Sequence, residues 1–193
     1  MKALVLAMAI LGLADAARAV TLSNGSFEQP DIGAPGAGGS LTGWTVGPGG
    51  AGLLGDGAAE GQYAAHLHGG RGGWLNQTVT GLVIGDRYEF AFDMMGDTAA
   101  LSRVVFAMIL TPGTSWYMAA VDETPADAPG WTRTLFYFDA PTTEVTLSFY
   151  SPYQGDRGAR LDNVRLGVAP VPAALPMLVA ALGGLVWLRR RRS

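Results

Sequence analysis

The chain has 193 residues, a formal net charge of −3 and no cysteine. Fifteen of its 16 acidic residues lie between residues 20 and 172, where only seven arginines balance them. An acidic surface argues against nucleic acid and anionic lipid headgroups as partners, and without cysteine no disulfide can hold the fold. About 150 residues in this middle part suffice for one domain with its own core.

Residues 1–19 have the pattern of a secretory signal peptide. Lys2 supplies the positive start, residues 3–13 form a short apolar run, and Ala17-Arg18-Ala19 is a cleavage site with small residues at the cut. A buried first helix is the alternative, but the three features together favour export. We therefore predict cleavage after Ala19 and a mature domain over residues 20–167.

The body of the chain, from Thr21 to Gly167, is expected to be all-β. Short alternating or β-rich runs are separated by turns that hold most of the 28 glycines. About 8 to 10 strands at this spacing predict a β-sandwich, most simply a jelly roll. The clearest runs are Tyr63–Leu67, Trp74–Thr80, Arg87–Met95, Val104–Leu110, Trp116–Val121, Thr132–Phe138, Val145–Tyr150 and Arg160–Leu166.

The run Arg87–Met95 shows the alternation most clearly. One face carries large apolar side chains and the other carries charges, which is typical of an antiparallel sandwich that is solvated on one side of each sheet. We expect the apolar face in the core and the charged face in water. The first set is Tyr88, Phe90, Phe92 and Met94, and the second is Arg87, Glu89 and Asp93.

Residues 168–193 read as a membrane-directed tail. Val168–Leu188 is an uncharged run of 21 residues, about the length of a helix that crosses a bilayer. Four arginines, Arg189–Arg192, follow it and mark the cytoplasmic side. The domain is therefore expected on the opposite side of a membrane, and a plain single-span anchor is one interpretation of the tail.

The tail also resembles the PEP-CTERM-like sorting signals of Gram-negative bacteria, in particular the VPLPA variant. Its box here is Pro170-Val171-Pro172-Ala173-Ala174, followed by the apolar run and the arginine cluster. Ala169 and Val171 depart from the usual Val and Leu of that variant. The resemblance implies processing near the box by exosortase, a membrane protease-transpeptidase, and display on the cell surface or release into an extracellular matrix.

Short motifs along the domain carry a second resemblance. In chain order they are Asn24-Gly25-Ser26-Phe27-Glu28, Gly43-Trp44, the segment 60–67 (EGQYAAHL), Gln77-Thr78 and Leu161-Asp162-Asn163-Val164. Their order resembles the galactose-binding-like jelly-roll superfamily, and within it xylan- and glucan-binding modules and a domain family of unknown function from plant cell walls and bacteria. The resemblance spans the mature domain and implies a protein that binds polysaccharide.

The same resemblance implies a structural calcium ion where the first and last strands meet. Glu28 and Asp162 stand at the matching positions. Calcium prefers 6 to 8 oxygen ligands, so two carboxylates with backbone carbonyls would serve. The alternative is that Glu28 caps a turn and Asp162 hydrogen-bonds a neighbouring strand.

Candidate ligand-binding residues gather at two glycine-rich connections, because sugar rings stack on aromatic side chains while polar groups bind their hydroxyls. Core packing is the alternative for each tryptophan, and we expect Trp44 and Trp131 to lie in the core. The candidates are His66, His68, Arg71, Trp74, Trp116 and Tyr117.

His66 and His68 are two residues apart on a strand and so share one face. They suit hydrogen bonding better than a transition metal, since no third ligand is close in sequence.

Three functions follow. The first is a non-catalytic surface module that binds polysaccharide, and the second is a structural matrix protein without a glycan site. The third is a small glycosidase, for which Glu89 and Asp93 would be the acids, although no catalytic motif supports it. An exposed aromatic platform on a sheet face would favour the first function over the second.

Overall fold

The computed structural model describes residues 20–29, 41–47, 49–68, 73–96, 103–121, 130–155 and 158–170. The predicted signal peptide, Arg71, and the sorting box from Val171 through Pro172 and Ala173 onwards lie outside the described residues. Within the described ranges, no helix is long and apolar enough to cross a bilayer.

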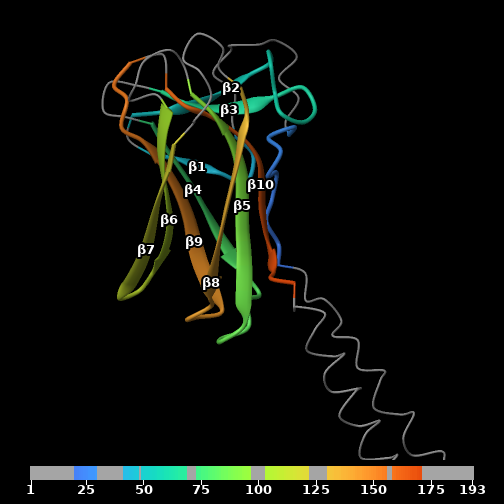
Figure 1. Cartoon of the computed structure of the whole chain (residues 1–193), viewed down its shortest axis with the longest axis vertical. Coiled ribbons are helices and arrows are strands. Elements are labelled where there is room, and N and C mark those ends of the chain that lie inside the picture. Colours follow the sequence, from blue (N-terminus) through green and yellow to red (C-terminus); the bar gives the residue numbers. More distant parts are fainter. Residues whose placement is uncertain are drawn as a thin grey trace, which may run out of the picture.

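Ten described strands form two antiparallel five-stranded sheets that face each other (Figure 1). The first sheet has the order β1-β4-β9-β6-β7 and the second has the order β2-β3-β10-β5-β8. The strands are β1 (Thr45–Val46), β2 (Ala51–Leu54), β3 (Ala64–Leu67), β4 (Gly73–Thr80), β5 (Arg87–Met95), β6 (Val104–Thr111), β7 (Thr114–Val121), β8 (Thr132–Asp139), β9 (Glu144–Ser151) and β10 (Arg160–Val168).

The expected all-β sandwich is confirmed. Each of the eight predicted runs coincides with a strand to within two residues at either end, and β5 has the predicted bounds. The sequence analysis missed β1 and β2, which have two and four residues. Runs this short show too little alternation to stand out from the glycine-rich segments around them.

The core lies between the sheets and is built by alternation along the strands. Tyr88, Phe90, Phe92 and Met94 of β5 are fully buried, as predicted. Phe149 of β9 packs against them from the first sheet, with its ring centroid 5.0 Å from that of Phe92 and 5.6 Å from that of Phe90. These contacts join the two sheets by burial alone.

Of the two tryptophans that were expected in the core, the structure places only one there. Trp44 lies in the core as expected, with its ring 5.4 Å from that of Phe27. The expectation for Trp131 was wrong: its side chain is only half-buried, and its indole Nε1 donates to the carbonyl of Gly57. The indole N–H needs a hydrogen-bond acceptor, and the loop carbonyl of Gly57 provides one while the ring packs on the loop.

Asp93 also departs from its expected place in solvent. The residue is only 9% exposed, because Asn163 Nδ2 donates to its Oδ2 at 2.9 Å and the Arg133 guanidinium lies 3.7 Å from its Oδ1. A carboxylate tolerates such burial only when it is paired and hydrogen-bonded.

The described N-terminal segment, residues 20–29, contains no strand but ties the two sheets together. Its Ser23 N–H donates to Gln77 Oε1 on β4, and Gly25 accepts a bond from the N–H of Val164 on β10. A Cβ at Gly25 would lie 2.1 Å from the carbonyl oxygen of Val164. Only glycine permits this approach of the two backbones.

The segment runs beside β10, so Val20 lies near Leu166 at one end of the sandwich (Figure 1). Val168, the first residue of the predicted membrane span, is the last residue of β10. The N–H of Ala169 still donates to the carbonyl of Arg87. The start of the apolar run therefore belongs to the sheet and not to a helix.

Candidate functional site

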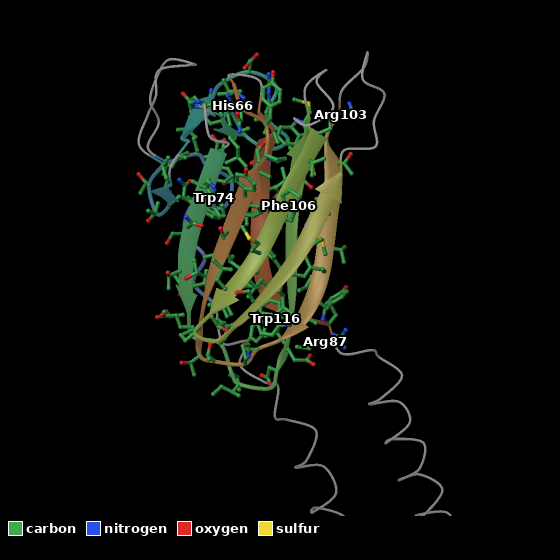
Figure 2. The ribbon with its side chains drawn as sticks, turned by 90° about the vertical axis from the view of Figure 1, so that its left-hand side faces the viewer. His66, Trp74, Arg87, Arg103, Phe106 and Trp116 are labelled. Atoms are coloured by element: carbon green, nitrogen blue, oxygen red, sulfur yellow. The ribbon has the colours of Figure 1, made fainter. Side chains whose placement is uncertain are left out.

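Three aromatic side chains cross the outer face of the first sheet. Trp74 on β4 lies directly opposite Tyr150 on β9, and Tyr150 lies directly opposite Phe106 on β6. The ring centroids are 4.6 Å and 6.1 Å apart, and all three residues are half-buried. We call them the aromatic row. Figure 2 views the molecule onto this sheet, with Trp74 and Phe106 on neighbouring parts of it.

The next cross-strand row on the same face is more polar. Asn76, Ser148 and Met108 occupy it in register. The Ser148 hydroxyl is buried and has no hydrogen-bond partner among the described residues. One step further along the strands, the hydroxyls of Thr78 and Thr146 lie 3.1 Å apart.

This arrangement suits a ligand with an apolar face and hydroxyl groups. Aromatic rings offer large contact area at little cost in side-chain entropy. The amide of Asn76 and the hydroxyls of Thr78 and Thr146, which unlike that of Ser148 are not buried, can supply hydrogen bonds that orient a ligand. The apolar area and the polar groups lie next to each other on one rigid sheet, so the face is pre-organised.

The structure separates the predicted binding residues. Trp74 belongs to the aromatic row. Trp116 lies on the inner side of β7, opposite the buried Ile109, and its ring is 6.2 Å from that of Phe138 in the second sheet. Tyr117 pairs with Met108, and its side chain lies outside what the structure describes.

His66 and His68 share one face as expected, with ring centroids 5.1 Å apart. They belong to the second sheet, where His66 pairs with Arg160 of β10. Trp74 lies on the outer face of the other sheet. Proximity in the sequence across the 69–72 connection therefore does not place the histidines in the aromatic row.

Tyr150 and Phe106 were missed by the sequence analysis. The alternation was visible, since Val145, Leu147 and Phe149 leave Tyr150 on the opposite face of its strand. The sequence does not show how β9 pairs with β4 and β6, and it is this strand pairing that places Tyr150 between Trp74 and Phe106.

Glu28 and Asp162 both bind the loop at residues 59–63, and we call this arrangement the carboxylate clamp. Glu28 Oε1 accepts from the N–H groups of Gln62 and Tyr63 at 2.9 and 2.8 Å. Asp162 Oδ2 accepts from those of Ala59 and Glu60 at 2.8 and 2.9 Å. The clamp fastens the N-terminal segment and the last strand to one loop.

Gly61 makes the clamp possible. It has a φ of +70°, and a Cβ there would lie 2.4 Å from Glu28 Oε1. The left-handed conformation and the close approach both require glycine.

Burial raises the pKa of Asp162 from 3.8 to about 6, and the nearby charge of Glu28 contributes to the rise. The hydrogen bonds from Glu60, Asn163 and Ala59 act in the opposite direction, since they stabilise the charged form. Burial outweighs them because the side chain has no contact with solvent.

The calcium predicted beside these two acids stays a prediction. The loop turns amide N–H groups toward Glu28 Oε1 and Asp162 Oδ2, and their positive hydrogens do not favour a cation. Among the described residues, no three acidic or histidine side chains group closely enough to hold a metal ion. The hydrogen bonds account for the positions of both carboxylates without an ion.

Comparison with solved structures shows the same two-sheet sandwich fold in two xylan-binding domains. The CBM22-1 xylan-binding domain from Paenibacillus barcinonensis Xyn10C matches with a TM-score of 0.53 and 15% identity, over 81% of this chain and 98% of that domain. A xylan-binding domain of CBM 22 matches with a TM-score of 0.51 and 18% identity, over 72% of this chain and 99% of the other. These likenesses show the expected two-sheet fold.

Sequence comparison adds one curated relative. Halomucin from Haloquadratum walsbyi is 27% identical over 143 residues, or 71% of this chain. The chain spans 2% of the length of halomucin. No family model matches the chain.

The carboxylate clamp yields a prediction on stability. Glu28→Ala leaves two backbone amides without their charged acceptor and should lower the free energy of unfolding by about 2–3 kcal/mol. Glu144→Ala, which removes an exposed acid from β9, is the matched control and should change it by less than about 0.5 kcal/mol. Chemical denaturation measures both, and equal values would contradict the clamp.

Thermal melts with and without a chelator test the calcium prediction. A bound ion stabilises the folded state by mass action, so chelation would lower the melting temperature of the native chain and leave that of Glu28→Gln/Asp162→Asn unchanged. An identical melting temperature for the native chain in both conditions would leave the hydrogen bonds as the full account.

Stability should also depend on pH through Asp162. Its pKa of about 6 in the folded state lies above the ordinary value of 3.8, so the folded protein binds a proton in a range where the unfolded chain does not. The free energy of unfolding should therefore rise as the pH falls from about 7 to 5, by about 1 kcal/mol from this group. Asp162→Asn removes that contribution. Parallel pH profiles of the two proteins would contradict the raised pKa.

Proposed function

We propose that this protein is a non-catalytic surface module that binds polysaccharide on the outer face of its first sheet. The observation that carries the proposal is the aromatic row of Trp74, Tyr150 and Phe106 beside a polar row. Similarity to the fold of xylan-binding domains supports it. An aromatic platform on a sheet face favours a glycan-binding module over a matrix spacer.

The ligand is a neutral polysaccharide. The residues that alternate outward along the three strands bearing the row are uncharged, with the exception of Glu144 at the far end of β9. The excess of acidic residues in the domain also disfavours an anionic glycan by repulsion.

The two acids considered for a glycosidase have other partners. Glu89 accepts a hydrogen bond from the Tyr137 hydroxyl at 2.9 Å, and Asp93 is held by Asn163 and Arg133. Both lie on the outer face of the second sheet, away from the aromatic row. We assign them structural roles.

Export and surface display belong to the same proposal. The signal-peptide pattern at residues 1–19 and the box at Pro170-Val171-Pro172-Ala173 with its arginine cluster support secretion, followed by exosortase sorting. Val20 and the end of β10 lie at the same end of the sandwich, while the aromatic row lies on a sheet face. A tether at the C-terminal end therefore leaves that face open to the surroundings.

Substitutions in the aromatic row test the binding function. Trp74→Ala and Tyr150→Ala should each weaken retention on an insoluble neutral polysaccharide such as xylan or a β-glucan by about tenfold, the loss of some 1.4 kcal/mol. Trp131→Ala removes the same kind of side chain from a half-buried site just before β8 and should leave retention unchanged. Thermal melts establish that each variant folds.

A panel of neutral glycans, assayed by affinity electrophoresis, completes this test. Retention of the native protein by at least one of them, lost in the two row variants only, supports the proposal. No retention by any glycan, or equal loss in all three variants, would favour the structural matrix function.

Sorting is tested by the mass of the mature protein. Export and exosortase processing should yield a surface-fraction species that starts at Val20 and ends near the box at residues 170–173. Intact-mass analysis measures both ends. A full-length cytoplasmic species that retains Met1 would contradict export, and a surface species that retains the arginine cluster would indicate a plain membrane anchor.

A further inference from the structure

Strand β8 forms a long edge of the second sheet. Among the described strands it pairs only with β5, over eight consecutive residues without a bulge. It contains neither proline nor lysine, which are common means of protecting an edge from further pairing. Its outward side chains, Arg133, Leu135, Tyr137 and Asp139, are all exposed.

The centre of this outward face is apolar. Leu135 is 47% exposed and Tyr137 is 43% exposed, which places both among the exposed large hydrophobic residues of the described structure. The Arg87 guanidinium lies 5.6 Å from the centre of the Tyr137 ring. The side chain of Leu135 remains exposed to solvent.

The four outward side chains of β8 would complement those of a second, antiparallel β8 strand. In an antiparallel pair of two β8 strands centred on Phe136, Leu135 lies opposite the partner's Tyr137. Arg133 then lies opposite the partner's Asp139, and both contacts occur twice by two-fold symmetry. We propose that a second copy of this chain binds here, edge to edge, and that the two second sheets join into one.

The strands next to β8 extend the charge pattern. Arg87 pairs in register with Asp139, and Asp93 pairs with Arg133, whose charged groups are 3.7 Å apart. In the dimer each outer row therefore runs Arg87, Asp139, the partner's Arg133 and the partner's Asp93. The signs alternate across four strands. Exposed ion pairs add little strength, but like charges opposite each other are unfavourable, so this pattern selects the register.

The other described edges do not offer this match. β1 and β2 have two and four residues, and β7 is as long as β8 but carries no charged residue. The dimer also leaves the aromatic row uncovered on the first sheet. Two rows in one assembly would raise the overall affinity for a long polysaccharide through avidity.

Charge reversal tests the register. The full chain in detergent should sediment as a dimer, and Asp139→Arg or Arg133→Asp should each weaken self-association at least tenfold, because each places like charges opposite one another at both ends of the strand pair. An equimolar mixture of the two variants restores opposite charges at both ends and should form a heterodimer. A change that merely damages the fold cannot be rescued by mixing.

Cysteine cross-linking supplies an independent measurement, because the native chain has no cysteine and every disulfide formed must join two chains. Opposite residues of antiparallel strands have Cα atoms about 4.5–5.5 Å apart, within the range of a disulfide. A mixture of Leu135→Cys and Tyr137→Cys chains should therefore cross-link at least tenfold faster than a mixture of Leu135→Cys with Ile84→Cys, a 64% exposed control site.

The results separate this inference from the proposed function. A native chain that sediments as a monomer, charge variants that remain dimeric, or equal cross-linking in both mixtures would overturn the dimer. Because the charge variants keep the aromatic row, they should still bind glycan whether or not they form dimers.

Discussion

The alternation of side chains along β9 is the constraint on which the rest of this structure depends. Phe149 points inward and packs against Phe90 and Phe92 of the opposite sheet, while the next residue, Tyr150, points outward between Trp74 and Phe106. Without a disulfide, burial of such aromatic residues is what holds the sheets together. The same strand therefore supplies the core and the centre of the aromatic row. Because core packing holds β9 in place, it also fixes the position of Tyr150.

The carboxylate clamp solves a different problem, the attachment of the N-terminal segment. Residues 20–29 form no strand, yet they bridge the two sheets beside β10 and carry the buried Phe27. Glu28 and Asp162, which are far apart in the sequence, bind the same loop. Gln77 of the first sheet holds the segment through two hydrogen bonds to the backbone of Ser23 and donates a third to the carbonyl of Gly43. Charge-assisted bonds to backbone amides are among the stronger hydrogen bonds in proteins. In this cysteine-free chain, these hydrogen bonds connect the N-terminal segment and the last strand through the loop at residues 59–63.

The outer faces of the two sheets have different chemistry. The first is mostly uncharged, with aromatic, hydroxyl and amide groups in adjacent rows. The second carries alternating charges from Arg87, Glu89 and Asp93 on β5 and from Arg133 and Asp139 on β8, around the exposed Leu135 and Tyr137. A sandwich allows this separation because each sheet hides only one of its faces. Glycan binding on one face and self-association at the edge of the other can therefore operate without competing for the same residues.

The sequence by itself determined the fold class, eight strands and the buried face of β5, because these follow from local alternation and turn residues. It also identified Trp74, Glu28 and Asp162 as residues of interest. It misplaced Trp131 and Asp93, and it grouped His66 and His68 with Trp74, because the hydrogen bonds of the first two and the sheet assignment of the histidines lie outside local pattern. Only the tertiary structure brought Trp74, Tyr150 and Phe106 together and set Glu28 beside Asp162 on one loop. These contacts join residues far apart in the chain, and they depend on strand order and register, which alternation within a single strand does not encode.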